Sequence, residues 1–147
     1  MKKVLFALVV LAVLLIACGG GTPEEVMTDV LVVTDGVSTR SYEVADLESL
    51  EEGQATFQDV TYRGVPLAAL LADAGFDSGS VSAVKATAAD GFSANYDPAL
   101  AARQDTLVAF ARTDGPLTAD DGTFRMVLPD QEGKMNPRNL VEITVIP

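Results

Sequence analysis

The sequence predicts an α+β domain in which roughly seven or eight short strands are mixed with about three short helices. Short runs of β-branched and aromatic residues recur along the chain, turn residues such as Asp-Gly separate them, and helical spacing of apolar residues is confined to a few places. Strands do not alternate regularly with long helices, so a doubly wound parallel sheet is not expected. No internal repeat is visible.

The domain is predicted to begin with two strands. Val30 to Val33 is a β-branched run ended by the turn residues Asp35-Gly36, after which Thr39 to Tyr42 can return as a second strand. Ala45 to Leu50 carries leucines three residues apart, which favours one or two helical turns. Gln54 to Tyr62 is predicted as a further strand because its bulky residues include two aromatic ones.

The clearest helix follows this strand. Pro66 suits a first helical position, and Gly75 supplies the left-handed stop. Between them, apolar residues recur with the spacing of one helix face. These residues are Leu67, Leu70, Leu71 and Ala74.

The next segments predict a second hairpin. Val81 to Ala88 is strand-like, Asp90-Gly91 turns the chain, and apolar residues alternate with polar ones from Phe92 to Tyr96. Asp97-Pro98 then caps a short helix that extends through Ala102.

The remaining elements are strands. Thr106 to Ala111 is continuously apolar, which is typical of a central strand covered on both faces. Asp114-Gly115-Pro116 predicts a turn, Arg125 to Leu128 a short strand ended by Pro129, and the alternation from Val141 to Val145 a closing strand.

The N-terminal segment has the parts of a bacterial export signal. Two lysines precede the apolar span Val4 to Ala17, and the only cysteine of the chain, Cys18, follows it. Leu15-Ile16-Ala17-Cys18 resembles the lipobox of bacterial lipoproteins, in which this cysteine is lipidated and becomes the first mature residue. A membrane-spanning helix would need about 20 apolar residues, and an ordinary cleaved signal would place a cysteine here only incidentally.

We therefore divide the chain into three parts. Residues 1–17 are the expected signal peptide, residues 18–27 the lipidated cysteine with a flexible tether, and residues 28–147 the folded domain. The expected location is the extracytoplasmic face of a bacterial membrane, with the lipid anchor as the contact to the membrane.

Composition excludes several classes of function. Without residues 1–17, which hold two lysines and no acidic residue, 8 basic and 21 acidic side chains leave a net charge of −13. This sign argues against nucleic acid as a partner. Histidine is absent and no cysteine follows Cys18, which excludes His-dependent triads and His or thiolate metal sites within residues 19–147.

Several segments, in this order, resemble the molybdopterin-binding domain of the sulfite oxidase family. The chain carries Thr61-Tyr62-Arg63-Gly64-Val65-Pro66-Leu67-Ala68-Ala69-Leu70-Leu71, then Ala89-Asp90-Gly91-Phe92, then Asp114-Gly115-Pro116-Leu117, and then Asp121-Gly122-Thr123-Phe124-Arg125-Met126-Val127-Leu128-Pro129. Leu140 to Ile146 is similar to the family's closing strand. The resemblance covers roughly residues 28–147 and implies a mixed, barrel-like sheet with short helices.

The same resemblance raises a conflict over the cofactor. In the family, a cysteine thiolate shortly before the Gly-Val-Pro-Leu helix ligates molybdenum, and a histidine contacts the cofactor. The corresponding stretch, residues 54–60, has no cysteine, and Asp59 or Tyr62 would offer only a hard oxygen ligand. The expectation is therefore no cofactor, with molybdopterin as the alternative, and no catalytic or metal-binding residue is assigned.

Six residues are candidate ligand contacts. Lys134, Asn136 and Arg138 lie where the family uses basic residues on the pterin phosphate, and together they could hold a phosphate or a carboxylate. The two cations could equally pair with nearby acidic residues as ordinary surface charge.

Asp90 and Tyr96, near Asn95, could line a polar pocket or simply serve the turn and the core. Arg125 could clamp a ligand or pair with a carboxylate, and Asp120-Asp121 could bind a hard cation or remain solvated.

These observations leave two classes of function. The first is a non-catalytic lipoprotein that binds a small anionic ligand or a protein partner on a molybdopterin-domain scaffold. The second is a molybdopterin-dependent oxidoreductase, or a redox subunit, with atypical metal ligation.

Overall fold

The computed structural model describes residues 29–147, and in this part of the chain the strands form two open five-stranded sheets rather than a closed barrel. The α+β class is confirmed. The expected signal peptide, Cys18, the tether and Thr28 lie outside the described residues. Within residues 29–147, no helix has both the length and the hydropathy of a membrane span.

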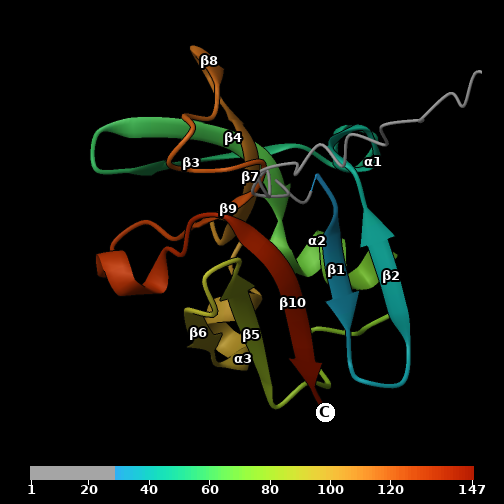
Figure 1. Cartoon of the computed structure of the whole chain (residues 1–147). Coiled ribbons are helices and arrows are strands. Elements are labelled where there is room, and N and C mark those ends of the chain that lie inside the picture. Colours follow the sequence, from blue (N-terminus) through green and yellow to red (C-terminus); the bar gives the residue numbers. More distant parts are fainter. Residues whose placement is uncertain (1–28) are drawn as a thin grey trace, which may run out of the picture.

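The first sheet has the strand order β2-β1-β10-β5-β6. Its strands are β1 (Leu31–Thr34), β2 (Thr39–Tyr42), β5 (Ala83–Ala88), β6 (Ser93–Tyr96) and β10 (Leu140–Ile146). β10 pairs in parallel with β1 and antiparallel with β5, so the last strand of the chain lies in the middle of the sheet (Figure 1).

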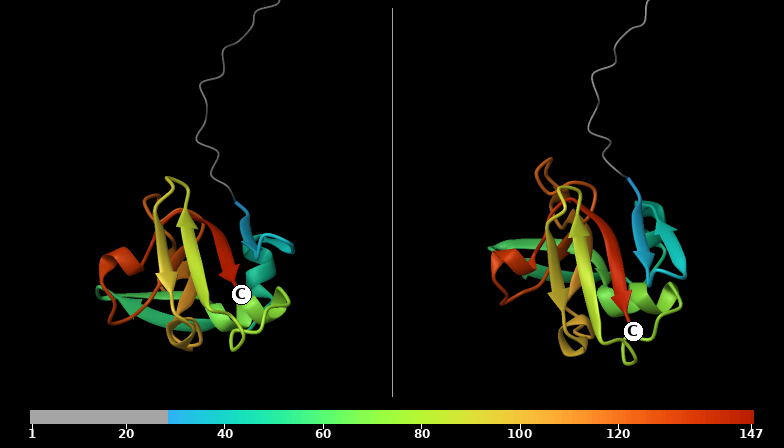
Figure 2. Two further views of the ribbon diagram at one scale, coloured as in Figure 1. Left: turned by 90° about the horizontal axis from the view of Figure 1, so that it is seen from below. Right: turned by 60° about the horizontal axis from the view of Figure 1, so that its bottom comes forward.

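The second sheet has the order β3-β4-β7-β8, with β9 also paired to β7. Its strands are β3 (Gly53–Phe57), β4 (Val60–Pro66), β7 (Leu107–Arg112), β8 (Gly115–Pro116) and β9 (Arg125–Val127). The helices are α1 (Val44–Glu48), α2 (Leu67–Asp73), α3 (Pro98–Ala101) and the 3-10 turn η1 (Gly133–Met135). Figure 2 shows the hairpin of β3 and β4 extending to one side of the first sheet.

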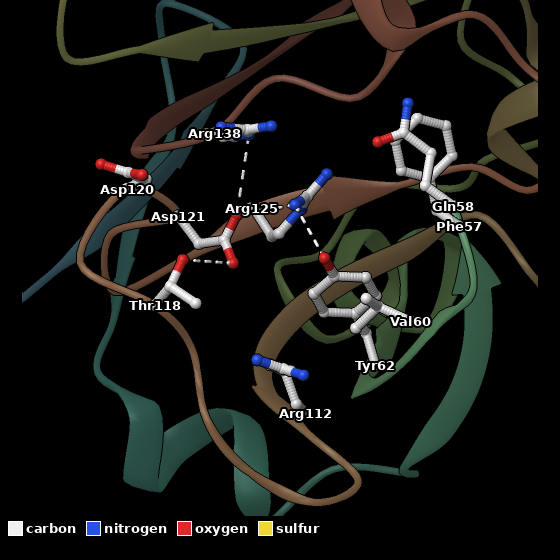
Figure 3. A pocket seen from close by; sticks show the side chains of 10 residues that line it. All are labelled: Phe57, Gln58, Val60, Tyr62, Arg112, Thr118, Asp120, Asp121, Arg125 and Arg138. Atoms are coloured by element: carbon white, nitrogen blue, oxygen red, sulfur yellow. Dashed lines mark hydrogen bonds and ion pairs between the residues drawn. The ribbon is translucent and has the colours of Figure 1, made fainter.

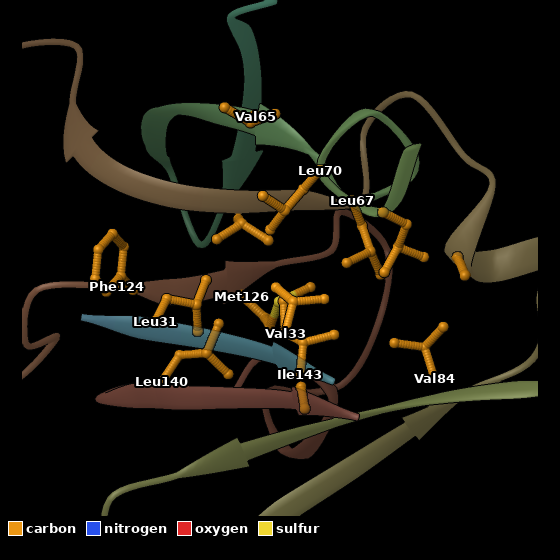
Figure 4. Packing of buried hydrophobic residues seen from close by; sticks show 14 of the residues in the cluster. Leu31, Val33, Val65, Leu67, Leu70, Val84, Phe124, Met126, Leu140 and Ile143 are labelled. Carbon is orange, nitrogen blue, oxygen red and sulfur yellow. The ribbon is translucent and has the colours of Figure 1, made fainter. Parts of the chain in front are cut away.

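The main core lies between the first sheet, the second sheet and α2. Figure 4 shows the leucines of α2 facing side chains of β1 and β10, with residues of the β9 region between them. The fully buried members include Leu31, Val33, Leu67, Leu70, Val84, Phe124, Met126, Leu140 and Ile143. A smaller cluster occupies the other face of the second sheet, built from Ala55, Tyr62, Leu107, Ala109 and Val127.

Gly64 lies at the close approach of β4 and β7. A β-bulge lies between Arg63 and Gly64 in the register of these strands. Any Cβ at Gly64 would collide with the backbone carbonyl of Val108. Glycine is therefore required at this position by the close approach of the two backbones.

Three predicted elements are corrected. Gln54 to Tyr62 is not one strand but most of a hairpin, because Gln58 and Asp59 form its turn with φ values of 49° and 63°. Pro66 is the last residue of β4 and caps α2, which begins at Leu67, because its ψ of 135° is extended. Val141 does not continue the buried alternation, since a register shift between Leu140 and Glu142 turns it to a half-buried position.

Candidate functional site

A pocket of about 180 Å³ lies between the β3–β4 hairpin and the segments that flank β9 (Figure 3). The hairpin contributes an aromatic and aliphatic wall, whereas β7, β9 and the adjoining loops contribute charged groups. The lining residues are Phe57, Gln58, Val60, Tyr62, Arg112, Thr118, Asp120, Asp121, Arg125 and Arg138.

Arg125 is the central charged group of the pocket. It is only 2% exposed, and its Nη1 donates to Asp121 Oδ1 at 2.6 Å and to the Tyr62 hydroxyl at 3.0 Å. Its Nε reaches the Met126 carbonyl at 3.3 Å. The guanidinium carbon lies 4.7 Å from the centre of the Tyr62 ring and 5.8 Å from that of Phe57. Cation–π contact and hydrogen bonds together compensate the cost of burying this charge.

Asp121 neutralises Arg125 and fixes the loop before β9. Its second carboxylate oxygen accepts the Thr118 hydroxyl at 3.0 Å, and its backbone carbonyl accepts the Asn139 amide at 2.8 Å. Arg138 Nε lies 3.7 Å from Asp121 Oδ1, beyond hydrogen-bond distance. The carboxylate thus faces two guanidinium groups but binds only one of them tightly.

Arg112 is the third cation of the pocket. Its Nη2 donates to Asp114 Oδ2 at 3.2 Å. Its Nε also lies 3.2 Å from Asp114 Oδ1. This Nε is buried, yet the contact lacks hydrogen-bond geometry and no other partner is present among the described residues. One donor of Arg112 is therefore poorly satisfied.

Only two of the six predicted ligand residues, Arg125 and Arg138, line this pocket. Lys134 is exposed and pairs with Glu132 at 2.9 Å, an interaction that raises the pKa of the Lys134 ammonium and lowers that of the Glu132 carboxyl. Asn136 is buried, and its side chain bridges the Leu128 amide at 2.6 Å and the Glu132 carbonyl at 3.1 Å. Lys134 and Asn136 therefore do not line the pocket with Arg138, and the three side chains do not form one ligand site.

Asp90 and Tyr96 lie outside the pocket as well. The Asp90 carboxylate accepts the Phe92 amide at 2.9 Å, which is turn chemistry. The Tyr96 hydroxyl donates to the Met135 carbonyl at 2.9 Å, and burial raises the pKa of this phenol.

The sequence analysis considered Tyr62 and Asp59 as oxygen ligands in place of the cysteine thiolate, and only one of them lies at the pocket. Tyr62 lines the pocket, whereas Asp59 is exposed at the turn of the hairpin. Sequence reasoning missed Phe57, Gln58, Val60, Arg112 and Thr118 as pocket residues, and no local motif marks them.

The pocket does not fit a molybdenum-pterin group. Among residues 29–147, no cluster of three His, Cys, Asp or Glu side chains is placed to hold a metal ion. Residues 24–147 contain no thiolate or imidazole donor. The volume of about 180 Å³ is also below the roughly 300–1,000 Å³ typical of sites for larger ligands.

Comparisons with known proteins place the fold. The sulfane dehydrogenase SoxCD from Paracoccus pantotrophus is a similar solved structure, with a TM-score of 0.67 at 20% identity over 80% of this chain. This chain spans 38% of the length of that SoxCD chain, and at this identity the likeness concerns the fold alone. No curated protein matches the sequence. The model of the oxidoreductase molybdopterin binding domain matches residues 24–147, which confirms the resemblance noted above, and the chain therefore belongs to this family.

Proposed function

We propose that the chain is a membrane-anchored extracytoplasmic lipoprotein whose molybdopterin-type fold binds a small anionic molecule and catalyses no molybdenum reaction. The lipid on Cys18 holds the domain at the membrane surface. The net charge of −13 after Cys18 becomes the first residue gives no electrostatic attraction to an anionic bilayer, so the acyl chains supply the anchorage.

The observation that carries the binding role is the buried guanidinium of Arg125 at the wall of a small pocket. Two further arginines line the same pocket, and the mature chain has only 8 basic residues in all. Such a concentration of scarce cations favours an anionic ligand over a neutral one. The other possibility within the class of non-catalytic binding lipoproteins is a protein partner at the membrane.

Family membership favours one alternative, a molybdopterin-dependent oxidoreductase or redox subunit with an oxygen ligand to the metal. Tyr62 is the candidate oxygen donor inside the pocket. Two observations argue against this alternative: residues 24–147 contain no thiolate or imidazole donor, and the pocket volume is only about 180 Å³.

Molybdenum and pterin content of the full chain, purified from its native membrane, decides between the two. We expect molybdenum well below one atom per chain. Stoichiometric molybdenum would overturn the proposal, and its loss in a Tyr62→Phe variant would then identify the substitute ligand.

A further inference from the structure

We propose that the pocket is a binding site for a small monocarboxylate, held by Arg125 and Arg138 with its apolar part against Phe57 and Val60. This inference rests on the small-anion part of the proposed function and names the chemical class of the ligand.

The donors for a carboxylate are present on one side of the pocket. The Nε and Nη1 groups of Arg125 are occupied, whereas its Nη2 makes no hydrogen bond to the described residues. Figure 3 shows the free end of this guanidinium pointing away from Asp121, toward the space between Arg138 and Gln58. A buried arginine with an uncommitted donor facing a pocket is a built anion contact.

Arg138 can complete the contact. It is 54% exposed, and its nearest carboxylate oxygen lies 3.7 Å away, so no hydrogen bond has to be broken for it to reach a ligand. The Tyr62 hydroxyl accepts from Arg125, which leaves its own proton available to a ligand oxygen. The Nη2 group of Arg125, the Arg138 guanidinium and the Tyr62 hydroxyl together offer donors to both oxygens of a carboxylate.

The charge of the pocket favours a single negative charge on the ligand. Asp114 pairs with Arg112 and Asp121 pairs tightly with Arg125, so Arg138 is the one lining arginine without a hydrogen bond to a carboxylate among the described residues. A monoanion matches this single uncommitted cation. A dianion such as sulfate would place surplus negative charge beside the buried Asp121 carboxylate, where burial makes an unpaired charge costly.

The remaining wall and the volume favour a carboxylate with a short apolar body. Phe57 and Val60 present apolar surface opposite the arginines. The pocket volume of about 180 Å³ is below the roughly 300–1,000 Å³ typical of sites for larger ligands. A few carbon atoms or one aromatic ring can fill it, whereas a multi-ring cofactor cannot.

The test is equilibrium dialysis of the full-length chain, purified in detergent, against radiolabelled benzoate. Protein-free detergent corrects for partition of benzoate into micelles. We expect one saturable site, displaced by unlabelled propionate but not by the neutral isostere benzamide or by an equal concentration of sulfate. Arg138→Gln should weaken binding about tenfold or more, since a hydrogen bond to a charged group is lost.

Arg103→Gln is the matched control. Arg103 is also partly exposed and ion-paired, with Asp105 at 2.6 Å, but it does not line the pocket. Its loss removes the same charge and should leave benzoate binding unchanged. Equal weakening by both variants would show a net-charge effect and overturn the assignment, as would the absence of saturable binding or a preference for sulfate.

The metal content of the same preparation keeps the two proposals separable. Benzoate binding that fails in molybdenum-free protein refutes the ligand class alone. Stoichiometric molybdenum refutes the non-catalytic role, whatever the dialysis shows.

Discussion

Replacing Asp121 with Asn would leave the buried guanidinium of Arg125 without the negative charge that neutralises it. Arg125 is 2% exposed and Asp121 4%, and their closest N–O distance is 2.6 Å. At an effective dielectric constant of about 20, opposite charges roughly 4 Å apart attract by about 4 kcal/mol. Removal of one partner from a buried pair costs about 3–5 kcal/mol. Arg138 would also lose its nearest carboxylate and would face Arg125 unscreened.

We therefore expect Asp121→Asn to lower the free energy of unfolding by about 3–5 kcal/mol, a large part of the roughly 5–15 kcal/mol typical of a domain. Tyr62→Phe keeps the ring beneath the guanidinium and removes only the hydroxyl, so its cost should be near 1.5 kcal/mol. Urea unfolding at neutral pH, followed by circular dichroism, measures both changes.

The control is Asp105→Asn, which removes the same charge from the partly exposed pair with Arg103 and should cost about 0–1 kcal/mol. The reasoning is refuted if Asp121→Asn lies within about 1 kcal/mol of the wild type, or if Asp105→Asn is equally costly.

Three further predictions concern the anchor, the core and the pH dependence. Cys18→Ser should give an unlipidated precursor with altered membrane fractionation, and acyl labelling that persists in this variant would contradict the anchor. Leu70→Ala should cost about 2–5 kcal/mol because Leu70 is fully buried; an unchanged melting curve would remove α2 from the core. Burial raises the pKa of Tyr96, so its contribution to stability is complete below pH of about 10 and is lost as pH rises further. Tyr96→Phe should therefore show a smaller loss of stability between about pH 8 and pH 11 than the wild type, and an equal loss would assign the effect to other groups.

Local signals predicted the elements whose cause is local. The period of three and four residues predicted α2, Gly75 ends it with a φ of 93°, and Asp97 caps α3 by accepting the Leu100 amide at 2.7 Å. The β3–β4 hairpin escaped prediction because its turn residues, Gln58 and Asp59, adopt left-handed conformations without the usual Asn-Gly or Asp-Gly signal.

The candidate site was largely beyond prediction because it depends on contacts between distant segments. Tyr62 and Arg125 are 63 residues apart in sequence, and only the pairing of β4 and β9 with β7 brings them together. Conversely, closeness in sequence suggested one shared ligand site for Lys134, Asn136 and Arg138, and only Arg138 lines the pocket. Lys134 and Arg138 flank Asn136, yet the buried Asn136 side chain is used up in holding its own loop.

The glycine at the crossing of β4 and β7 has a consequence for how such chains evolve. Gly64 belongs to the Gly-Val-Pro-Leu segment, and the carbonyl of Val108 excludes any larger residue there. This constraint arises from two backbones and involves no metal, pterin or substrate. A lineage can therefore lose the side chains that bind the metal one after another, while selection for folding alone preserves the Gly-Val-Pro-Leu segment. The segment records ancestry and architecture, and the catalytic state of each descendant must be established from its own donor atoms.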